Sequence, residues 1–297
     1  MTFHIIEGGV TAAKGFQTSG IHCGIRKNRS KSDLALIYSD VPCAAAAVYT
    51  QNLVKGAPIA VTKRNIADGM ARAVICNSGN ANTCNADGEE KAQKMCDLIA
   101  AELHIDSSDV IVASTGVIGQ VLPIEPIANS VKTLVEALSP TGSNDAAKAI
   151  MTTDTVEKEY ALEVELDGKM VTIGGITKGS GMIHPNMATM LGFLTTDASI
   201  TSELLNEALH TAIEDTFNMV SVDGDTSTND MVSVMASGLA ENQTITEKNH
   251  DYELFTQALT EVCAVLSRKI AKDGEGATRL LECAVTGAKT KEDARTI

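Results

Sequence analysis

The chain contains 297 residues with a mass of 31.2 kDa, enough for one large domain or two modest domains with a sizeable core. Hydrophobic residues make up 44% and charged residues 21%, which is ordinary globular usage and argues against a disordered, collagen-like or coiled-coil chain. The net charge of −14 repels phosphate backbones, and five Phe, four Tyr and no Trp leave few platforms on which bases could stack. General nucleic-acid binding is therefore disfavoured.

The apolar runs are far shorter than the roughly 20 residues that a membrane-spanning helix needs; the longest include Val41–Val48 and Ala71–Cys76. The first residues lack a basic region followed by an apolar region, so no secretory signal is visible. Seven cysteines without a Cys-x-x-Cys pair are typical of reduced, mostly buried thiols. These features predict a soluble, cytoplasmic protein that acts on small molecules, with no nucleic-acid or membrane partner.

The first part of the chain alternates short apolar segments with longer amphipathic ones. Two strands are expected at Asp33–Tyr38 and Ala45–Thr50, because both segments are apolar and bounded by polar or turn residues. Pro58 can begin a helix that Gly69 would end. A buried strand follows at Ala71–Cys76, and then the loop Asn77–Asn82, rich in residues that tolerate positive φ.

The middle of the chain continues this alternation. A helix over Asp87–Leu103 gathers its apolar residues on one face, and a buried strand is expected at Asp109–Ala113. The clearest hairpin joins Tyr160–Leu166 to Lys169–Ile173 through Asp167-Gly168, the favoured pair for a two-residue turn.

The last third predicts further elements of both kinds. Thr201–Phe217 is helical with Ser202 as a candidate N-cap, Asp230–Met235 is strand-like, and Tyr252–Lys272 is strongly periodic. A final strand is expected at Arg279–Val285, and a helix begins near Lys289. Alternating α and β elements predict a layered α/β sandwich, and the hairpin indicates that its sheets are mixed instead of purely parallel.

Two glycine- and aspartate-rich segments invite ligand assignments that their spacing does not support. Gly174–Gly181 lacks the phosphate-loop pattern, because Lys178 precedes Gly179 instead of following it. Asp223–Asp230 lacks the glycine and glutamate that a calcium loop needs at its sixth and twelfth positions, so a polar loop held by Asx hydrogen bonds is favoured. Without a His or Cys cluster, no metal is expected.

Thr189 is the remaining candidate nucleophile. By itself, a threonine among methionines is a buried strand residue, and its hydroxyl reacts poorly unless a base lies beside it. One such base is the threonine's own α-amino group, whose pKa of about 7.7–8.0 lies near physiological pH. That group exists only if the chain is cut immediately before Thr189.

Several motifs, in order along the chain, give this sequence a family resemblance. The segment Lys178–Leu191 strongly resembles the ArgJ-type glutamate/ornithine N-acetyltransferases of the arginine pathway. Further matching motifs are Asn77–Asn82, Ser114–Gly119, Met151–Thr155, Thr195–Ala198, Asp223–Asp230 and Asp273–Thr278. The resemblance therefore covers nearly the whole chain.

The resemblance implies an ArgJ/DmpA-like, N-terminal-nucleophile architecture made as a precursor. The precursor would cut itself between Ala188 and Thr189 into an α chain, residues 1–188, and a β chain, residues 189–297, that assemble as a heterotetramer of two each. Thr189 would take an acetyl group from N2-acetylornithine and pass it to glutamate through an acetyl-enzyme. No cofactor is implied, although some members also accept acetyl-CoA as a co-substrate.

The resemblance also assigns roles around the nucleophile. The Thr115 hydroxyl and the Gly116 N–H would form the oxyanion hole, and Lys178 would set the local charge and bind substrate. Glu275 would pair with an ammonium group of the amino acid, and Thr153 would also contact it. Taken singly, Lys178 is a solvated loop charge, Glu275 a helix-end acid and Thr115 a turn hydroxyl.

Two alternatives remain open at this stage. Family members continue past the position of Ile297, where an Asn and a Ser or Thr bind substrate; neither residue can be assigned here. A cavity open on that side would admit water and favour hydrolysis of the acetyl-enzyme. The alternatives are an N-terminal-threonine aminopeptidase or amidase of the same fold, and an inactive, truncated relative that binds amino acids.

Overall fold

The fold is built on one mixed sheet. The computed structural model describes residues 3–184 and 190–296, and within them nine strands form a sheet in the order β1-β6-β7-β8-β9-β3-β4-β5, with β2 paired to β3. Most neighbours are antiparallel, but β4 pairs with β5 and β8 with β9 in parallel. The strands are β1 His4–Ile6, β2 Phe16–Ile21, β3 Leu34–Tyr49, β4 Met70–Asn77, β5 Val110–Ser114, β6 Lys158–Leu166, β7 Lys169–Lys178, β8 Leu191–Thr196 and β9 Met231–Ala236.

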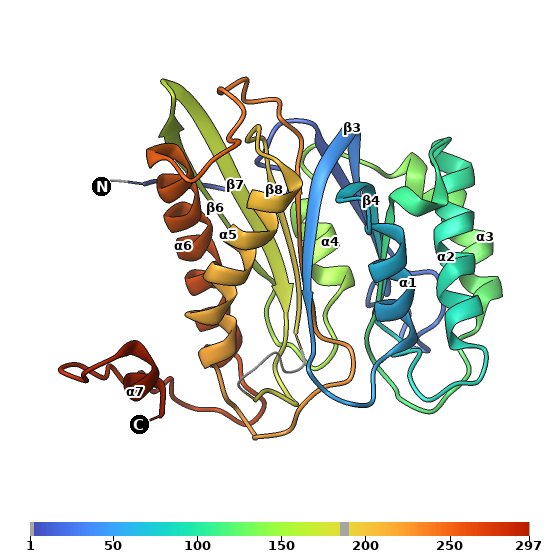
Figure 1. Ribbon diagram of the computed structural model, residues 1–297. Coiled ribbons are helices and arrows are strands. Elements are labelled where there is room, and N and C mark those ends of the chain that lie inside the picture. The colour runs from blue at the N-terminus through green and yellow to red at the C-terminus, as the bar shows by residue number, and fades with distance from the viewer. Residues whose placement is uncertain (1–2, 185–189, 297) are drawn as a thin grey trace.

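Helices cover both faces of this sheet (Figure 1). The helices are α1 Ala57–Asn65, α2 Gly88–Leu103, α3 Ile124–Glu136, α4 Ser143–Ala149, α5 Ser202–Glu214, α6 His250–Lys272 and α7 Lys291–Thr296. One face packs against α5 and α6 over one half and against α1, α2 and α3 over the other. The opposite face packs against α4 and the segment that leads into β2. The predicted mixed α/β sandwich is therefore confirmed.

Strand periodicity places side chains alternately in these two cores. Along β5, Val110 and Val112 pack toward α2 and α3, whereas Ile111 and Ala113 pack into the core that contains α4. In the β6–β7 hairpin, Leu162 is fully buried while the neighbouring Glu165 is exposed. A strand with both faces buried is apolar almost throughout, and β5 and β9 fit this pattern with one serine each.

The predicted turn and helix boundaries are mostly confirmed. The Asp167-Gly168 turn has φ values of +51° and +69°, the left-handed pair that a two-residue hairpin requires. The helices expected from Pro58, over Asp87–Leu103 and over Tyr252–Lys272 are all present. At α5 the N-cap is Thr201 and not Ser202, because the Thr201 hydroxyl accepts the Leu204 N–H.

Two of the predicted strands are parts of one strand, and a third does not form. The segments Asp33–Tyr38 and Ala45–Thr50 belong to the single long strand β3, in which a register shift between Tyr38 and Cys43 accommodates Pro42. The expected strand Arg279–Val285 does not form, because these residues pair with no strand and lie exposed, with Leu281 at 90%. An apolar segment needs a partner for its backbone groups before it becomes a strand.

Both pieces of the proposed precursor contribute to the same sheet. From the second piece, β8 pairs with β7 on one side, and β9 pairs with β3 on the other. Two chains cut within the segment before β8 would therefore remain joined by main-chain hydrogen bonds on both sides. No helix within residues 3–184 and 190–296 is long and apolar enough to cross a membrane.

Candidate active site

A cavity of about 850 Å³ opens at one edge of the sheet. The edge consists of the carboxyl ends of β4, β5 and β7 and the amino ends of β6, β8 and β9. The cavity is lined by all five described residues to which the sequence assigned roles: Thr115, Gly116, Thr153, Lys178 and Glu275. The proposed nucleophile Thr189 and the preceding Ala188 lie outside the described residues.

Thr115 and Gly116 follow β5 directly and form one wall of the cavity. The Thr115 N–H donates to the Asn77 carbonyl at 2.9 Å, which extends the pairing of β4 with β5 by one residue. Gly116 has φ +128°, and a Cβ there would lie 2.6 Å from the backbone carbon of Gly79, so only glycine fits. Within residues 3–184 and 190–296 the Gly116 N–H has no acceptor, and it is therefore available to a ligand.

Lys178 ends β7 and is only 2% exposed. Its Nζ donates to the Thr115 Oγ1 at 3.5 Å. A hydroxyl that accepts from an ammonium must direct its own proton elsewhere, so Lys178 orients the Thr115 O–H as a donor. Burial lowers the pKa of Lys178, while the negative charges of Asp154 and Asp230 oppose that effect.

The pKa values of the two carboxyl groups that face Lys178 are shifted in opposite directions, although burial acts on both in the same way. Burial alone would raise the pKa of Asp154, but the charges of Lys178 and Lys158 and the bonds that it accepts hold that pKa below its usual value. Burial raises the pKa of Asp230 to about 8, and the Met190 N–H, the nearby Ser227 hydroxyl and the charge of Lys178 only partly counteract it. The ionised group beside Lys178 at neutral pH is therefore Asp154.

The loop 223–230 holds the chain on both sides of the undescribed residues 185–189. Asp223 accepts the Met182 and Ile183 N–H groups before them, and Asp230 accepts the Met190 N–H after them at 2.8 Å. This agrees with the prediction of a polar loop held by Asx hydrogen bonds. No group of His, Cys, Asp or Glu in the described part of the chain could hold a metal ion.

Thr153 and Glu275 lie at the rim of the cavity and are exposed. The Glu275 N–H donates to the Ser180 carbonyl at 2.8 Å, which docks its loop against the end of β7. Its carboxylate lies over Gly181, where an added Cβ would be 2.4 Å from the Glu275 Oε2. A glycine at 181 thus leaves room for the acid that the sequence assigned to an ammonium group.

Sequence reasoning missed several charged residues in and around this cavity. Asp154, Lys158 and Asp230 were not singled out, although Asp154 and Asp230 belong to segments that carry the resemblance. Of the missed residues, Arg26, Lys27 and Lys31 of a basic loop line the cavity itself. For Asp230 the usable signal was its position directly before the apolar strand β9, because residues at strand ends meet at a sheet edge.

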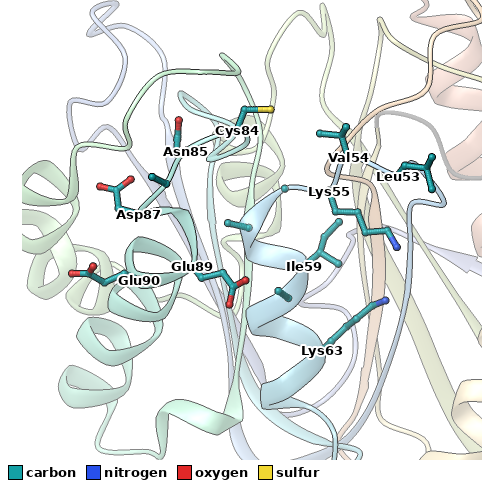
Figure 2. A pocket seen from close by; sticks show the side chains of 14 residues that line it. Leu53, Val54, Lys55, Ile59, Lys63, Cys84, Asn85, Asp87, Glu89 and Glu90 are labelled. Carbon is teal, nitrogen blue, oxygen red and sulfur yellow. The ribbon is translucent and has the colours of Figure 1, made fainter.

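A second cavity of about 870 Å³ lies between the amino ends of α1 and α2 (Figure 2). Lys55 and Lys63 approach it from one side, and Asp87, Glu89 and Glu90 lie on the other. Every charged residue that lines it is exposed or half-buried, and none of the candidate residues contributes to it. Charges in contact with water are weak anchors for a ligand, so the first cavity is the candidate active site.

Comparison with known proteins bears on the family of the chain. The family model described as the ArgJ family matches residues 17–297. The arginine biosynthesis bifunctional protein ArgJ of Symbiobacterium thermophilum is 51% identical over 292 residues, which are 98% of this chain and 73% of that protein.

Solved structures resemble both the sequence and the fold. A crystal structure of the arginine biosynthesis bifunctional protein ArgJ from Bacillus halodurans is 43% identical, with a TM-score of 0.59 over 63% of this chain and 99% of that chain. The ornithine acetyltransferase of Mycobacterium tuberculosis, solved in complex with ornithine, is 36% identical, with a TM-score of 0.57 over 62% of this chain and 98% of that chain.

A more distant structure confirms the expected architecture. The L-aminopeptidase D-Ala-esterase/amidase of Ochrobactrum anthropi, a variant of the N-terminal-nucleophile hydrolase fold, is 13% identical with a TM-score of 0.53 over 89% of this chain and 87% of that chain. That likeness concerns the fold alone. With a family model over most of its length and a relative at 51% identity, the chain belongs to the ArgJ family.

Proposed function

We propose that this protein transfers the acetyl group of N2-acetylornithine to glutamate through an acetyl-Thr189 intermediate, in arginine biosynthesis. The observation that carries the proposal is the cavity, which gathers Thr115, Gly116, Thr153, Lys178 and Glu275 from separate parts of the chain. The names of the relatives, an arginine biosynthesis protein and an ornithine acetyltransferase, support the same reaction.

The reaction consists of two half-reactions of the same kind. The Thr189 Oγ attacks the acetyl carbonyl carbon, and the threonine α-amine takes the hydroxyl proton and returns it to the leaving α-nitrogen of ornithine. The α-amine of glutamate then attacks the ester, and its proton passes back to the Thr189 oxygen through the same amine. An N-terminal amine with a pKa near 8 suits both proton transfers.

The oxyanion of each tetrahedral intermediate needs donors that are fixed in advance. We assign the Thr115 O–H and the Gly116 N–H to this role, because Lys178 orients the first and the second lacks an acceptor among the described residues. One such donor contributes a factor of about 10²–10³ to the rate. Donor and acceptor share one cavity because both are amino acids, for which Lys178, Thr153 and Glu275 are the anchors.

Self-cleavage between Ala188 and Thr189 is part of the proposal, because it creates the amine. The two related crystal chains are covered over 99% and 98% of their own length but only 63% and 62% of this chain. That share of 297 residues is close in length to residues 1–188, the α chain that the resemblance implies. The pairing of β8 with β7 and of β9 with β3 explains why the two products would stay together.

Four further properties belong to the proposal and follow from the resemblance. The protein has no resident cofactor, acetyl-CoA is a second acetyl donor, two α and two β chains assemble, and the enzyme is cytoplasmic. Native mass spectrometry tests the assembly, and N-acetylglutamate formation from acetyl-CoA and glutamate tests the second donor.

The deciding experiment combines a denaturing gel with intact mass and an acetyl-transfer assay. We expect fragments that end at Ala188 and begin at Thr189, and one N-acetylglutamate formed for each N2-acetylornithine consumed. Thr189→Ala should leave one uncut, inactive polypeptide. Release of ornithine without glutamate would indicate a hydrolase, an intact inactive wild type would indicate a binding protein, and a cut, active Thr189→Ala variant would refute the assignment.

A further inference from the structure

A row of buried charges joins the three loops that carry Thr153, Lys178 and Glu275. At its centre is Lys158, the first residue of β6, whose side chain is fully buried. Its Nζ donates to the Asp154 Oδ1 at 2.8 Å, to the Asp273 Oδ2 at 2.6 Å and to the Val156 carbonyl at 3.2 Å. All three of its donors are satisfied inside the protein.

Asp154 fixes the backbone on two sides of the cavity. Its Oδ1 also accepts the Gly179 N–H at 2.7 Å, directly after Lys178, and its Oδ2 accepts the Thr152 N–H at 3.0 Å, directly before Thr153. A carboxylate that accepts two backbone N–H groups and an ammonium leaves little freedom to the segments it joins.

Asp273 makes the corresponding connection for the Glu275 loop. Its Oδ2 accepts the Thr155 N–H at 3.0 Å, and its own carbonyl accepts the Ser180 hydroxyl at 2.7 Å. Glu275 follows two residues later, and its N–H donates to the Ser180 carbonyl. The Lys158–Asp273 pair therefore connects residues on opposite sides of the proposed cut.

Stability alone does not explain such an arrangement. Burying an ammonium and two carboxylates costs several kcal/mol per ion, and apolar residues of the same volume often stabilise a core equally well or better. A position beneath the cavity, with each ion bonded to a loop that carries a candidate substrate residue, points to placement of those loops instead.

We propose that Lys158 is a positioning residue that places Glu275 and Thr153 opposite Lys178, and so determines recognition of the ammonium end of ornithine. This inference rests on the proposed function. In the absence of the Lys158 ammonium, Asp154 and Asp273 repel each other, and the Glu275 loop moves away from Gly181. The loss falls on ornithine recognition more than on the oxyanion donors Thr115 and Gly116, which directly follow β5 and make no bond to Lys158, Asp154 or Asp273.

The test measures ornithine binding by calorimetry and steady-state rates for the cleaved protein, wild type against Lys158→Met. We expect ornithine affinity to fall about tenfold or more, which is about 1.4 kcal/mol. The KM for N2-acetylornithine should rise by a similar factor while kcat changes less than about threefold, the pattern of lost substrate binding.

Lys269→Met is the matched control. Lys269, on α6, also connects the two sides of the proposed cut, because its Nζ donates to the Glu159 carbonyl at 2.6 Å, but it does not line the cavity. This variant should bind ornithine as the wild type does. Equal losses in both variants, or unchanged affinity in a folded Lys158→Met protein, would overturn the inference.

A second variant covers the case in which Lys158→Met does not fold. Asp273→Asn keeps the size of the side chain and removes its charge, which weakens the bond to Lys158 most and the bonds from Thr155 less. We therefore expect a smaller loss of ornithine affinity in the same direction. Unchanged affinity in this variant would also contradict the inference. A wild type that binds ornithine but does not transfer acetyl would refute the proposed function. The effect of Lys158→Met on ornithine affinity could still be measured in that case.

Discussion

Asp230 offers a sharp test of the electrostatics next to the proposed cut. It is 1% exposed, its Oδ1 accepts the Met190 N–H, and its Oδ2 has no hydrogen-bond partner in the described part of the chain. Asp230→Asn preserves the accepting oxygen and replaces the unpartnered oxygen with an NH₂ group. A protonated carboxyl and an amide each leave a donor unmatched there, so aspartic acid and asparagine should be nearly equivalent at low pH.

The difference in free energy of unfolding between the wild type and Asp230→Asn grows as the pH rises. Burial raises the pKa of Asp230 from 3.8 to about 8, so between these values the folded protein holds a proton that the unfolded chain releases. The wild type therefore loses free energy of unfolding from pH 4 to pH 8, at about 1.4 kcal/mol per pH unit. Asparagine does not titrate. We expect Asp230→Asn to match the wild type near pH 4 and to exceed it by about 5 kcal/mol at pH 8 and above.

Urea unfolding at pH 4.5, 6 and 8 measures the free energy of unfolding of both proteins. Both carry Thr189→Ala, so that a single uncut chain unfolds. Asp154→Asn is the contrasting variant, because the pKa of Asp154 is lowered. Its ionised form stabilises the fold above the unfolded pKa and loses that effect as the pH falls. Asp154→Asn should therefore be less stable than the parent at pH 8. A pH-independent effect of Asp230→Asn, or a variant less stable than its parent at pH 8, would refute the reasoning.

Three further substitutions test the cavity. Thr115→Val should lower kcat by about 10²–10³ with little change in KM in the transfer assay. Gly116→Ala should lose activity and thermal stability, because its Cβ meets backbone at 2.6 Å, whereas Gly119→Ala, also at positive φ but in open space, should retain activity. Gly181→Ala should displace the Glu275 carboxylate and raise the KM for N2-acetylornithine several-fold at unchanged kcat, as measured by initial rates.

Local patterns predicted those parts of the fold whose determinants are local. The β6–β7 hairpin was predictable because alternation and a turn pair coincide within a few residues. The strand expected at Arg279–Val285 had the composition of a strand, but composition does not specify a partner. The single strand β3 was predicted as two strands because each apolar segment is bounded by polar or turn residues. In the structure a register shift between Tyr38 and Cys43 carries one strand through them.

Only those site residues that lie in the motifs shared with the family were predictable from the sequence. Thr115, Gly116 and Lys178 were found by resemblance, and without it each reads as an ordinary loop or turn residue. The role of Lys158 was not predictable, because its partner Asp273 is 115 residues away and its full burial is a property of the folded chain. Pairings of this kind become visible only when the sheet brings distant loops to one edge.

The opposite pKa directions of Asp154 and Asp230 bear on how a threonine amine could act as a base. A carboxylate beside an amine favours the protonated ammonium, which cannot accept a proton. Asp230, which holds the residue after Thr189, has its pKa raised to about 8 and is therefore largely neutral at pH 7. The ionised carboxylate is Asp154, and it is bonded to Lys158 and to backbone N–H groups. Of this pair, the negative charge at pH 7 therefore lies on Asp154, bonded to Lys158, and Asp230 contributes little charge beside Met190.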